Sequence, residues 1–103
     1  MESERRRGPR YLFIADTEVT DKTSDAKRSA RTNELSISGC FIETRNPVPA
    51  GTELWIRISH RNSTFTAFGC VISAVPNAGM CVAFTSMEPK ELSVLEKWLP
   101  AAI

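Results

Sequence analysis

The feature that most constrains the fold is a succession of short segments in which apolar and polar residues alternate. Segment 54–59 places an aliphatic side chain at every second position, and segment 39–44 follows the same period of two. Turn-forming residues follow such segments, with two prolines and a glycine in 46–51 and Pro-Asn-Ala-Gly in 76–79. Consecutive short strands joined by turns predict an antiparallel sheet that curls or closes.

Further strands are expected on both sides of these segments. Segment 11–19 is rich in β-branched and aromatic residues and predicts the first strand. Segment 29–35 is interpreted as a strand only from its position between two better candidates. Segment 64–75 is long enough for one strand, in which Gly69 marks a bulge or a close contact, and 80–84 is the last strand. The count is about six strands.

The C-terminal segment has a different period. Pro89 suits the first turn of a helix, because the N–H that proline lacks has no partner there. Apolar residues then recur at helical spacing: Leu92, Leu95, Trp98 and Leu99. Pro100 ends the element. We expect a helix that caps the sheet or barrel, with Trp98 at the seam between them; Trp55 fits either a seam or an interface.

The chain of 103 residues is long enough for one small domain, and its net charge of +1 gives no overall attraction to nucleic acid. The three cysteines lack C-x-x-C spacing and lie in apolar runs, which predicts reduced core thiols. The apolar runs are too short to cross a membrane and no signal peptide is seen, so we expect a cytoplasmic protein. His60 is expected in an exposed turn, and no constellation of catalytic or metal-binding residues stands out.

Two short stretches carry the functional hypothesis. Residues 5–10 contain four arginines and no acid, and guanidinium groups bind phosphates and guanine edges through paired N–H bonds. Taken alone, the stretch is more typical of a solvated basic tail. Residues 34–39, Glu-Leu-Ser-Ile-Ser-Gly, combine a carboxylate, two hydroxyls and a glycine before a strand. Taken alone, they are more typical of a turn or bulge between two strands.

Together the two stretches resemble the PilZ domain family, receptor modules for the bacterial second messenger cyclic di-GMP. Arg6-Arg7-Gly8-Pro9-Arg10 fits the R-x-x-x-R motif of that family. Residues 34–39 fit its [D/N]-x-S-x-x-G motif at Ser36 and Gly39, with Glu34 in the Asp/Asn place. The resemblance covers about residues 5–99, including the Pro-Val-Pro-Ala-Gly-Thr turn and the segment from Gly79 to Phe84.

The resemblance implies a mainly β fold, a six-stranded antiparallel β-barrel of the split-barrel type with a C-terminal α-helix. Residues 1–9 would be a flexible arginine-rich N-terminal arm, and residues 10–103 the barrel domain with its helix. The resemblance also implies that Arg6 and Arg10 contact phosphates and guanine faces of cyclic di-GMP, with Arg7 as a helper.

For the second motif, the resemblance implies three roles. Glu34 would accept hydrogen bonds from the N1–H and N2–H edge of guanine. Ser36 would bond to a phosphate or orient the neighbouring backbone, and Gly39 would leave room for the base.

The leading hypothesis is a non-catalytic cytoplasmic receptor that needs no cofactor. Its arginine arm orders on nucleotide binding and relays the signal to an unidentified protein partner. The alternative is a PilZ-like interaction module that does not bind the nucleotide. General nucleic-acid binding by the basic arm is a weaker third hypothesis, which the near-zero net charge disfavours.

Overall fold

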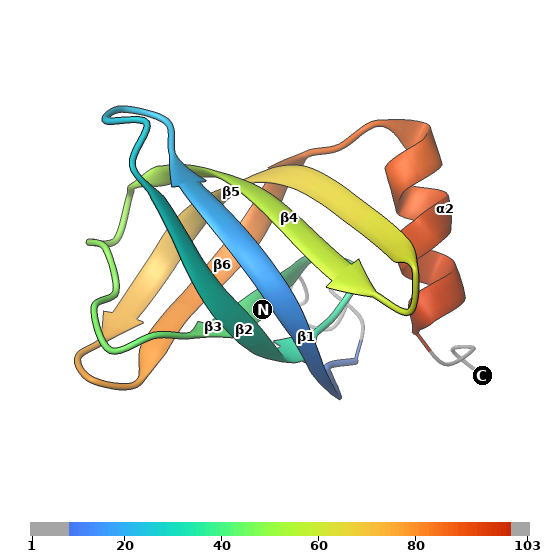
Figure 1. Ribbon diagram of the computed structural model, residues 1–103, viewed down its shortest axis with the longest axis horizontal. Coiled ribbons are helices and arrows are strands. Elements are labelled where there is room, and N and C mark those ends of the chain that lie inside the picture. The colour runs from blue at the N-terminus through green and yellow to red at the C-terminus, as the bar shows by residue number, and fades with distance from the viewer. Residues whose placement is uncertain (1–8, 100–103) are drawn as a thin grey trace, which may run out of the picture.

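The computed structural model describes residues 9–99 and shows a closed antiparallel barrel with a helix at one end (Figure 1). The elements are β1 (Tyr11–Asp21), β2 (Lys27–Leu35), β3 (Gly39–Glu43), β4 (Glu53–His60), β5 (Ser63–Val75), β6 (Gly79–Ser86) and α2 (Pro89–Trp98). The strand order around the barrel is β1-β2-β3-β6-β5-β4, and β1 pairs with β4 to close it. The expected six-stranded barrel and C-terminal helix are confirmed. The predicted arm, apart from Pro9, lies outside the described residues.

The apolar residues of the alternating segments point into the barrel, and the polar residues between them lie on its surface. In β4, the aliphatic side chains of Leu54, Ile56 and Ile58 are fully buried while Arg57 is exposed. Strands β2, β3, β5 and β6 add further fully buried side chains: Leu35, Ile42, Phe65 and Met80. Because a barrel has no free edge, every inward side chain packs against the others in one core.

Gly69 marks an irregularity in β5, as expected. The register with β6 shifts between Phe68 and Gly69, and a Cβ atom at Gly69 would lie 2.7 Å from the Cγ1 atom of Val82. A second shift follows between Val71 and Ser73. Such irregularities bend a strand and increase its twist, which helps a sheet of this size to close.

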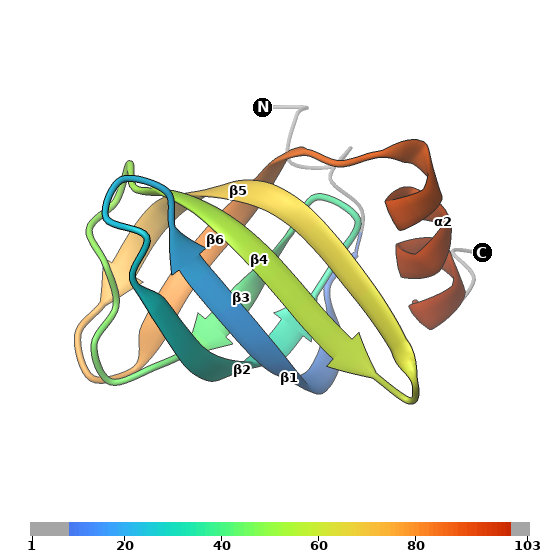
Figure 2. The ribbon, with the colours of Figure 1, turned by 45° about the horizontal axis from the view of Figure 1, so that its top comes forward.

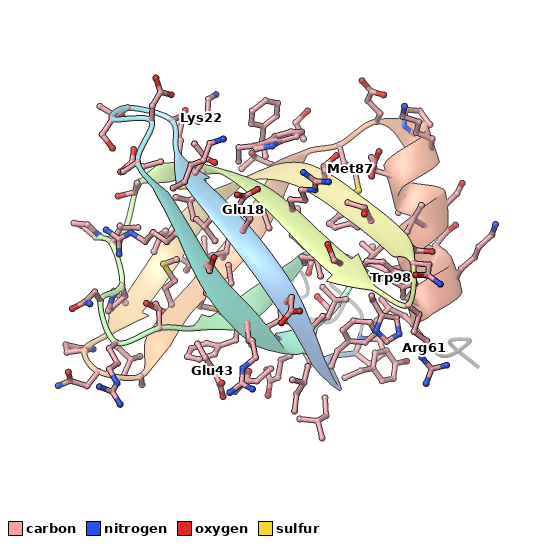
Figure 3. All side chains as sticks on the ribbon, viewed as in Figure 1. Glu18, Lys22, Glu43, Arg61, Met87 and Trp98 are labelled. Atoms are coloured by element: carbon pink, nitrogen blue, oxygen red, sulfur yellow. The ribbon has the colours of Figure 1, made fainter. Side chains whose placement is uncertain are left out.

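Helix α2 covers one open end of the barrel, and β6 leads into it through a short connection (Figure 2). Pro89 is in its first turn and the side chain of Leu95 is fully buried. Trp98 lies where the helix meets the barrel (Figure 3), with its ring centroid 5.6 Å from that of Phe13. The expected place of Trp98 at the seam is confirmed.

The prediction of an exposed turn for His60 is wrong. His60 is the last residue of β4 and is half-buried. Its ring centroid lies 4.6 Å from that of Phe13 and 5.4 Å from that of Trp98. Strand β1 and helix α2 bring these two aromatic rings to His60 from distant parts of the chain, so no local pattern indicates the contact.

Candidate functional site

The turn between β2 and β3 is held together by the side chain of Ser36. This side chain is buried, and its Oγ atom accepts hydrogen bonds from the backbone N–H groups of Ser38 and Gly39, both at 3.2 Å. The Ser36 backbone N–H in turn donates to the Gly39 carbonyl oxygen at 2.8 Å. These contacts fix the backbone of the turn, as one of the two roles implied for Ser36 requires. A contact between Ser36 and a phosphate stays a prediction.

Gly39 begins β3 and lies against the backbone of β6. It pairs with Ala83, and a Cβ atom at Gly39 would lie only 2.2 Å from the Val82 carbonyl oxygen. No larger residue fits without moving one of the two strands. Glycine is therefore required here by the barrel itself. The room for a base that the resemblance implies at this position stays a prediction.

Arg10 and Glu34 come from the two predicted motifs and form an ion pair. Arg10 directly precedes β1, Glu34 is next to last in β2, and the Arg10 Nη1 and Glu34 Oε1 atoms are 3.6 Å apart. About half of each side chain is exposed, at 57% for Arg10 and 46% for Glu34. The structure thus brings a guanidinium and a carboxylate together on the surface. Arg6 and Arg7 lie outside the described residues.

A small hollow connects Arg10 to the turn. Its lining comes from the start of the described chain, the β2–β3 turn and strands β3, β5 and β6: Arg10, Ser36, Ser38, Gly39, Cys40, Ile72, Cys81, Val82 and Ala83. Its volume is about 60 Å³. Pockets that enclose a drug-sized ligand have volumes of about 300–1,000 Å³. The hollow is therefore too small to enclose a ligand of that size.

Ile72 is a member of this hollow that sequence reasoning missed. Its side chain is 54% exposed, although its neighbour Val71 is buried. Alternation of inward and outward residues along β5 puts Ile72 on the outer face, and this pattern is the signal in the sequence that would have found it. The register shift between Val71 and Ser73 then places it beside Arg10 and Cys81, and that neighbourhood depends on pairing with β6.

Cys40, which lines the hollow, is buried in the barrel core. Burial, with a smaller contribution from Cys81, raises the pKa of the Cys40 thiol from 9.0 to about 12, so Cys40 is a neutral core side chain near neutral pH. Cys70 and Cys81 are free and half-buried.

Among residues 9–99, no group of three histidine, cysteine or acidic side chains could hold a metal ion. In the same range, no helix is long and apolar enough to span a bilayer.

Comparison with models of protein families identifies one family. Residues 4–100 match the family model described as PilZ domain. Three solved structures share the fold, all at less than 20% identity: the PilZ domain of CeSA from a cellulose-synthesizing bacterium, the inhibitor of motility MotI/DgrA of Bacillus subtilis, and the PilZ domain of YcgR from Escherichia coli with c-di-GMP. No curated protein matches the sequence.

The structural agreement extends over most of the chain. The CeSA domain has 16% identity and a TM-score of 0.72, with 88% of this chain and 94% of that chain covered. The YcgR domain has 18% identity and a TM-score of 0.70, with 91% and 88% covered. MotI/DgrA has 11% identity and a TM-score of 0.73; 86% of this chain is covered but only 46% of that chain. At these identities the likeness shows the fold.

Proposed function

This chain belongs to the PilZ domain family, a family of cyclic di-GMP receptors, and from that premise we propose that it is a non-catalytic receptor for cyclic di-GMP. The observation that carries the proposal is the proximity of Arg10 to Glu34 above the turn that Ser36 organises. These residues come from both family motifs, and Arg10 adjoins both Glu34 and the hollow that Ser36 lines.

Arg10 and Glu34 match different groups of a guanine nucleotide. A half-exposed arginine offers paired N–H donors to a phosphate or to the O6 and N7 atoms of guanine. A half-exposed carboxylate accepts from the N1–H and N2–H groups on the opposite edge of the base. In our proposal, Arg10 takes the first role and Glu34 the second, and their mutual ion pair gives way to contacts with the nucleotide.

The N-terminal arginines complete the proposed site. Because the hollow beside Arg10 measures only about 60 Å³, the nucleotide needs a cover from outside the barrel. Residues 1–9 directly precede Arg10 and contain Arg6 and Arg7. We propose that this arm closes over the bound nucleotide, with Arg6 on phosphate and guanine and Arg7 assisting, while Gly39 leaves room for the base. Closure would change the surface offered to a partner protein in the bacterial cytoplasm.

Calorimetry with the purified protein tests this proposal. We expect saturable binding of cyclic di-GMP that is lost in the Arg6→Ala and Arg10→Ala variants. Arg45→Ala is the matched control, because Arg45 is an exposed arginine in the connection between β3 and β4. No detectable binding to the unsubstituted protein at high micromolar nucleotide would overturn the proposal.

The same ion pair favours one alternative, a PilZ module that acts through protein contacts without the nucleotide. Glu34 is one methylene longer than the aspartate of the family motif, and its carboxylate lies within 4 Å of Arg10. The pair could then be the permanent state of both side chains. Glu34→Asp separates the two functions: if only this variant binds cyclic di-GMP, the alternative holds.

A further inference from the structure

A groove with aromatic walls lies where β6 passes into α2, separate from the Arg10–Glu34 pair. Its volume is about 370 Å³, and it shares no lining residue with the hollow beside Arg10. Its lining comes from β4, β5, β6 and the start of α2: Trp55, Thr66, Ala67, Phe68, Ser86, Met87, Glu88, Lys90 and Glu91. We call it the Trp55 groove.

One wall of the Trp55 groove is a pair of aromatic rings on the outside of the barrel. Trp55 of β4 and Phe68 of β5 face each other across the two strands, with ring centroids 4.8 Å apart. The Phe68 ring already carries a cation, since the Lys22 Nζ atom lies 4.5 Å from the ring centroid. Aromatic faces attract ammonium and guanidinium groups through the quadrupole of the ring.

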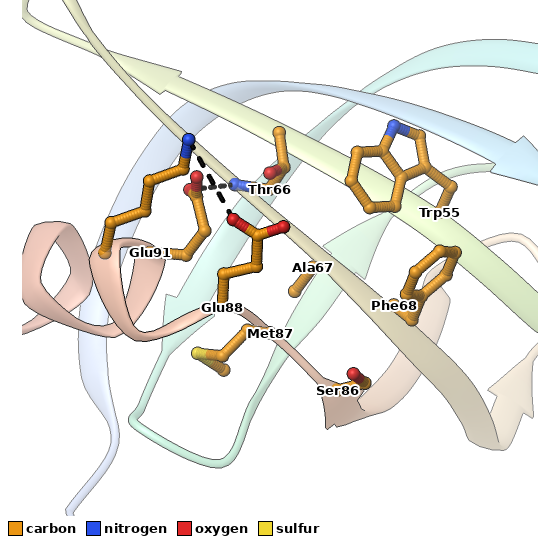
Figure 4. A pocket seen from close by; sticks show the side chains of 9 residues that line it. Trp55, Thr66, Ala67, Phe68, Ser86, Met87, Glu88 and Glu91 are labelled. Atoms are coloured by element: carbon orange, nitrogen blue, oxygen red, sulfur yellow. Dashed lines mark hydrogen bonds and ion pairs between the residues drawn. The ribbon is translucent and has the colours of Figure 1, made fainter.

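The opposite wall carries two carboxylates (Figure 4). Glu91 accepts the backbone N–H of Thr66 at 2.9 Å, which holds its side chain in place. Glu88 is 74% exposed and has Lys90 at 3.9 Å. The lining therefore contains two acids and one lysine. An aromatic face opposite carboxylates matches arginine, whose flat guanidinium stacks on rings and donates paired N–H bonds to carboxylates.

We propose that the Trp55 groove holds the arginines of this chain's own N-terminal segment, Arg5-Arg6-Arg7, when no nucleotide is bound. These are three successive cations, and no acid occurs between residues 5 and 10. Their charge complements the groove, and an arginine inserted between Trp55 and Glu88 would meet both a ring face and a carboxylate.

The segment is long enough to reach. Arg10 shares its hollow with Ala83, and the Phe84 N–H donates to the Ser38 carbonyl oxygen of the turn at 2.8 Å. From Ala83 to Met87 of the groove the chain advances four residues, at most about 14 Å. From Arg10 back to Arg5 it advances five residues, at most about 18 Å. Arg5 and Arg6, five and four residues before Arg10, can therefore reach the groove while Arg10 stays beside its hollow.

The functional consequence of this inference depends on the proposed function, which is binding of cyclic di-GMP. The arginines that cover the nucleotide cannot occupy the groove at the same time, so nucleotide binding would empty it. The Trp55 groove would then be the surface that the signal exposes, and the N-terminal segment would be its inhibitor in the absence of the nucleotide.

Nuclear magnetic resonance of the full chain without nucleotide tests the inference. The indole N–H of Trp55 reports on the groove, and that of Trp98, packed on Phe13 and His60, serves as an internal reference. We expect the triple variant Arg5→Gln, Arg6→Gln, Arg7→Gln to move the Trp55 resonance and to leave that of Trp98 in place. Glu88→Gln should move it similarly, and adding the triple change to Glu88→Gln should move it little further.

Controls separate this inference from its rivals and from the proposed function. Arg45→Gln removes a cation elsewhere and should leave Trp55 unmoved. The inference is overturned if the triple variant leaves the Trp55 resonance in place. It is also overturned if the triple change shifts this resonance as far in the Glu88→Gln background as in the unsubstituted chain. A shift that grows with protein concentration assigns the groove to a second copy instead. Because no nucleotide is present, these outcomes do not depend on whether the chain binds cyclic di-GMP.

A second measurement links groove and nucleotide. If the groove competes for the arginines, Glu88→Gln should bind cyclic di-GMP about two- to fivefold more tightly, the effect expected from the loss of one exposed ion pair. An unchanged or weaker affinity in this variant would contradict competition.

Discussion

Arg10 and Glu34 form an ion pair across the start of β1 and the end of β2, with 3.6 Å between Nη1 and Oε1. The side chains are separated by more than twenty positions in the sequence, and each belongs to a different motif. Since both are about half exposed, the pair contributes at most about 1 kcal/mol to folding. A ligand that offers better partners to both can therefore displace it.

Truncation of Glu34 tests its role as guanine acceptor. We expect Glu34→Ala to weaken cyclic di-GMP binding about tenfold or more, because hydrogen bonds to a charged acceptor contribute about 1.5–3 kcal/mol. Calorimetry measures the change. Glu43→Ala is the control, since Glu43 is an exposed carboxylate paired with Arg31 on the same barrel. Equal affinities for Glu34→Ala and the unsubstituted chain would remove Glu34 from the site.

The apolar side chain beside Arg10 provides a second test of the nucleotide site. Ile72→Ser should weaken nucleotide binding without lowering stability, because the side chain is 54% exposed and lines the hollow. Val75→Ser is the matched control: Val75 is 47% exposed on the same strand and does not line the hollow. If both variants bind as tightly as the unsubstituted chain, the nucleotide does not contact Ile72.

Gly39→Ala tests the close approach of β3 and β6. We expect a loss of about 1–3 kcal/mol in the free energy of unfolding, because the added Cβ atom overlaps the Val82 carbonyl oxygen and the strands must separate. Urea unfolding followed by circular dichroism measures this loss. Gly51→Ala is the comparison: Gly51 has open space around it and a φ of +93°, so only backbone strain should appear there. A Gly39→Ala variant as stable as the parent would contradict the contact.

Ser36→Ala tests the hydroxyl that holds the β2–β3 turn. The substitution leaves the N–H groups of Ser38 and Gly39 without their side-chain acceptor, and we expect a loss of about 1–2 kcal/mol in unfolding free energy. The same denaturant titration measures it. Ser29→Ala, at an exposed position of β2, should change stability little. Equal effects of the two substitutions would show that the Ser36 hydroxyl is not needed for the turn.

The buried thiol of Cys40 should make the folded protein less stable at high pH. Burial raises the pKa of its thiol from 9.0 to about 12, so above pH 9 the unfolded chain loses this proton while the folded chain keeps it. The unfolded state then binds fewer protons, and stability falls as pH rises from about 9 to about 12. Cys40→Ala should lack this part of the decline. Parallel stability curves for both proteins across that range would rule out the shift.

Local pattern was enough to predict most of the fold. The period of two in β3 and β4, the proline-rich connection after β3 and the helical spacing after Pro89 all indicate the elements found. The site indicated by the family motifs stays a prediction. The observed boundaries of the strands differ from the expected ones by a few residues. The first strand runs on to Asp21, whose side-chain carboxylate accepts the Thr23 N–H at 2.8 Å and so begins the turn two residues later than expected.

Local pattern does not predict which residues from distant parts of the sequence come into contact. Segment 11–19 is predicted as a strand from its own composition, because β-branched and aromatic residues favour strands. Its pairing with β4, which closes the barrel, follows from the twist and irregularities of all six strands together. Pairing of β1 with β4 brings the His60 ring to 4.6 Å from that of Phe13. Pairing of β3 with β6 sets Gly39 against Val82, and pairing of β1 with β2 brings Arg10 beside Glu34. The sequence by itself determined the elements and the motifs; closure of the barrel decided their neighbours, because contacts between distant strands depend on register.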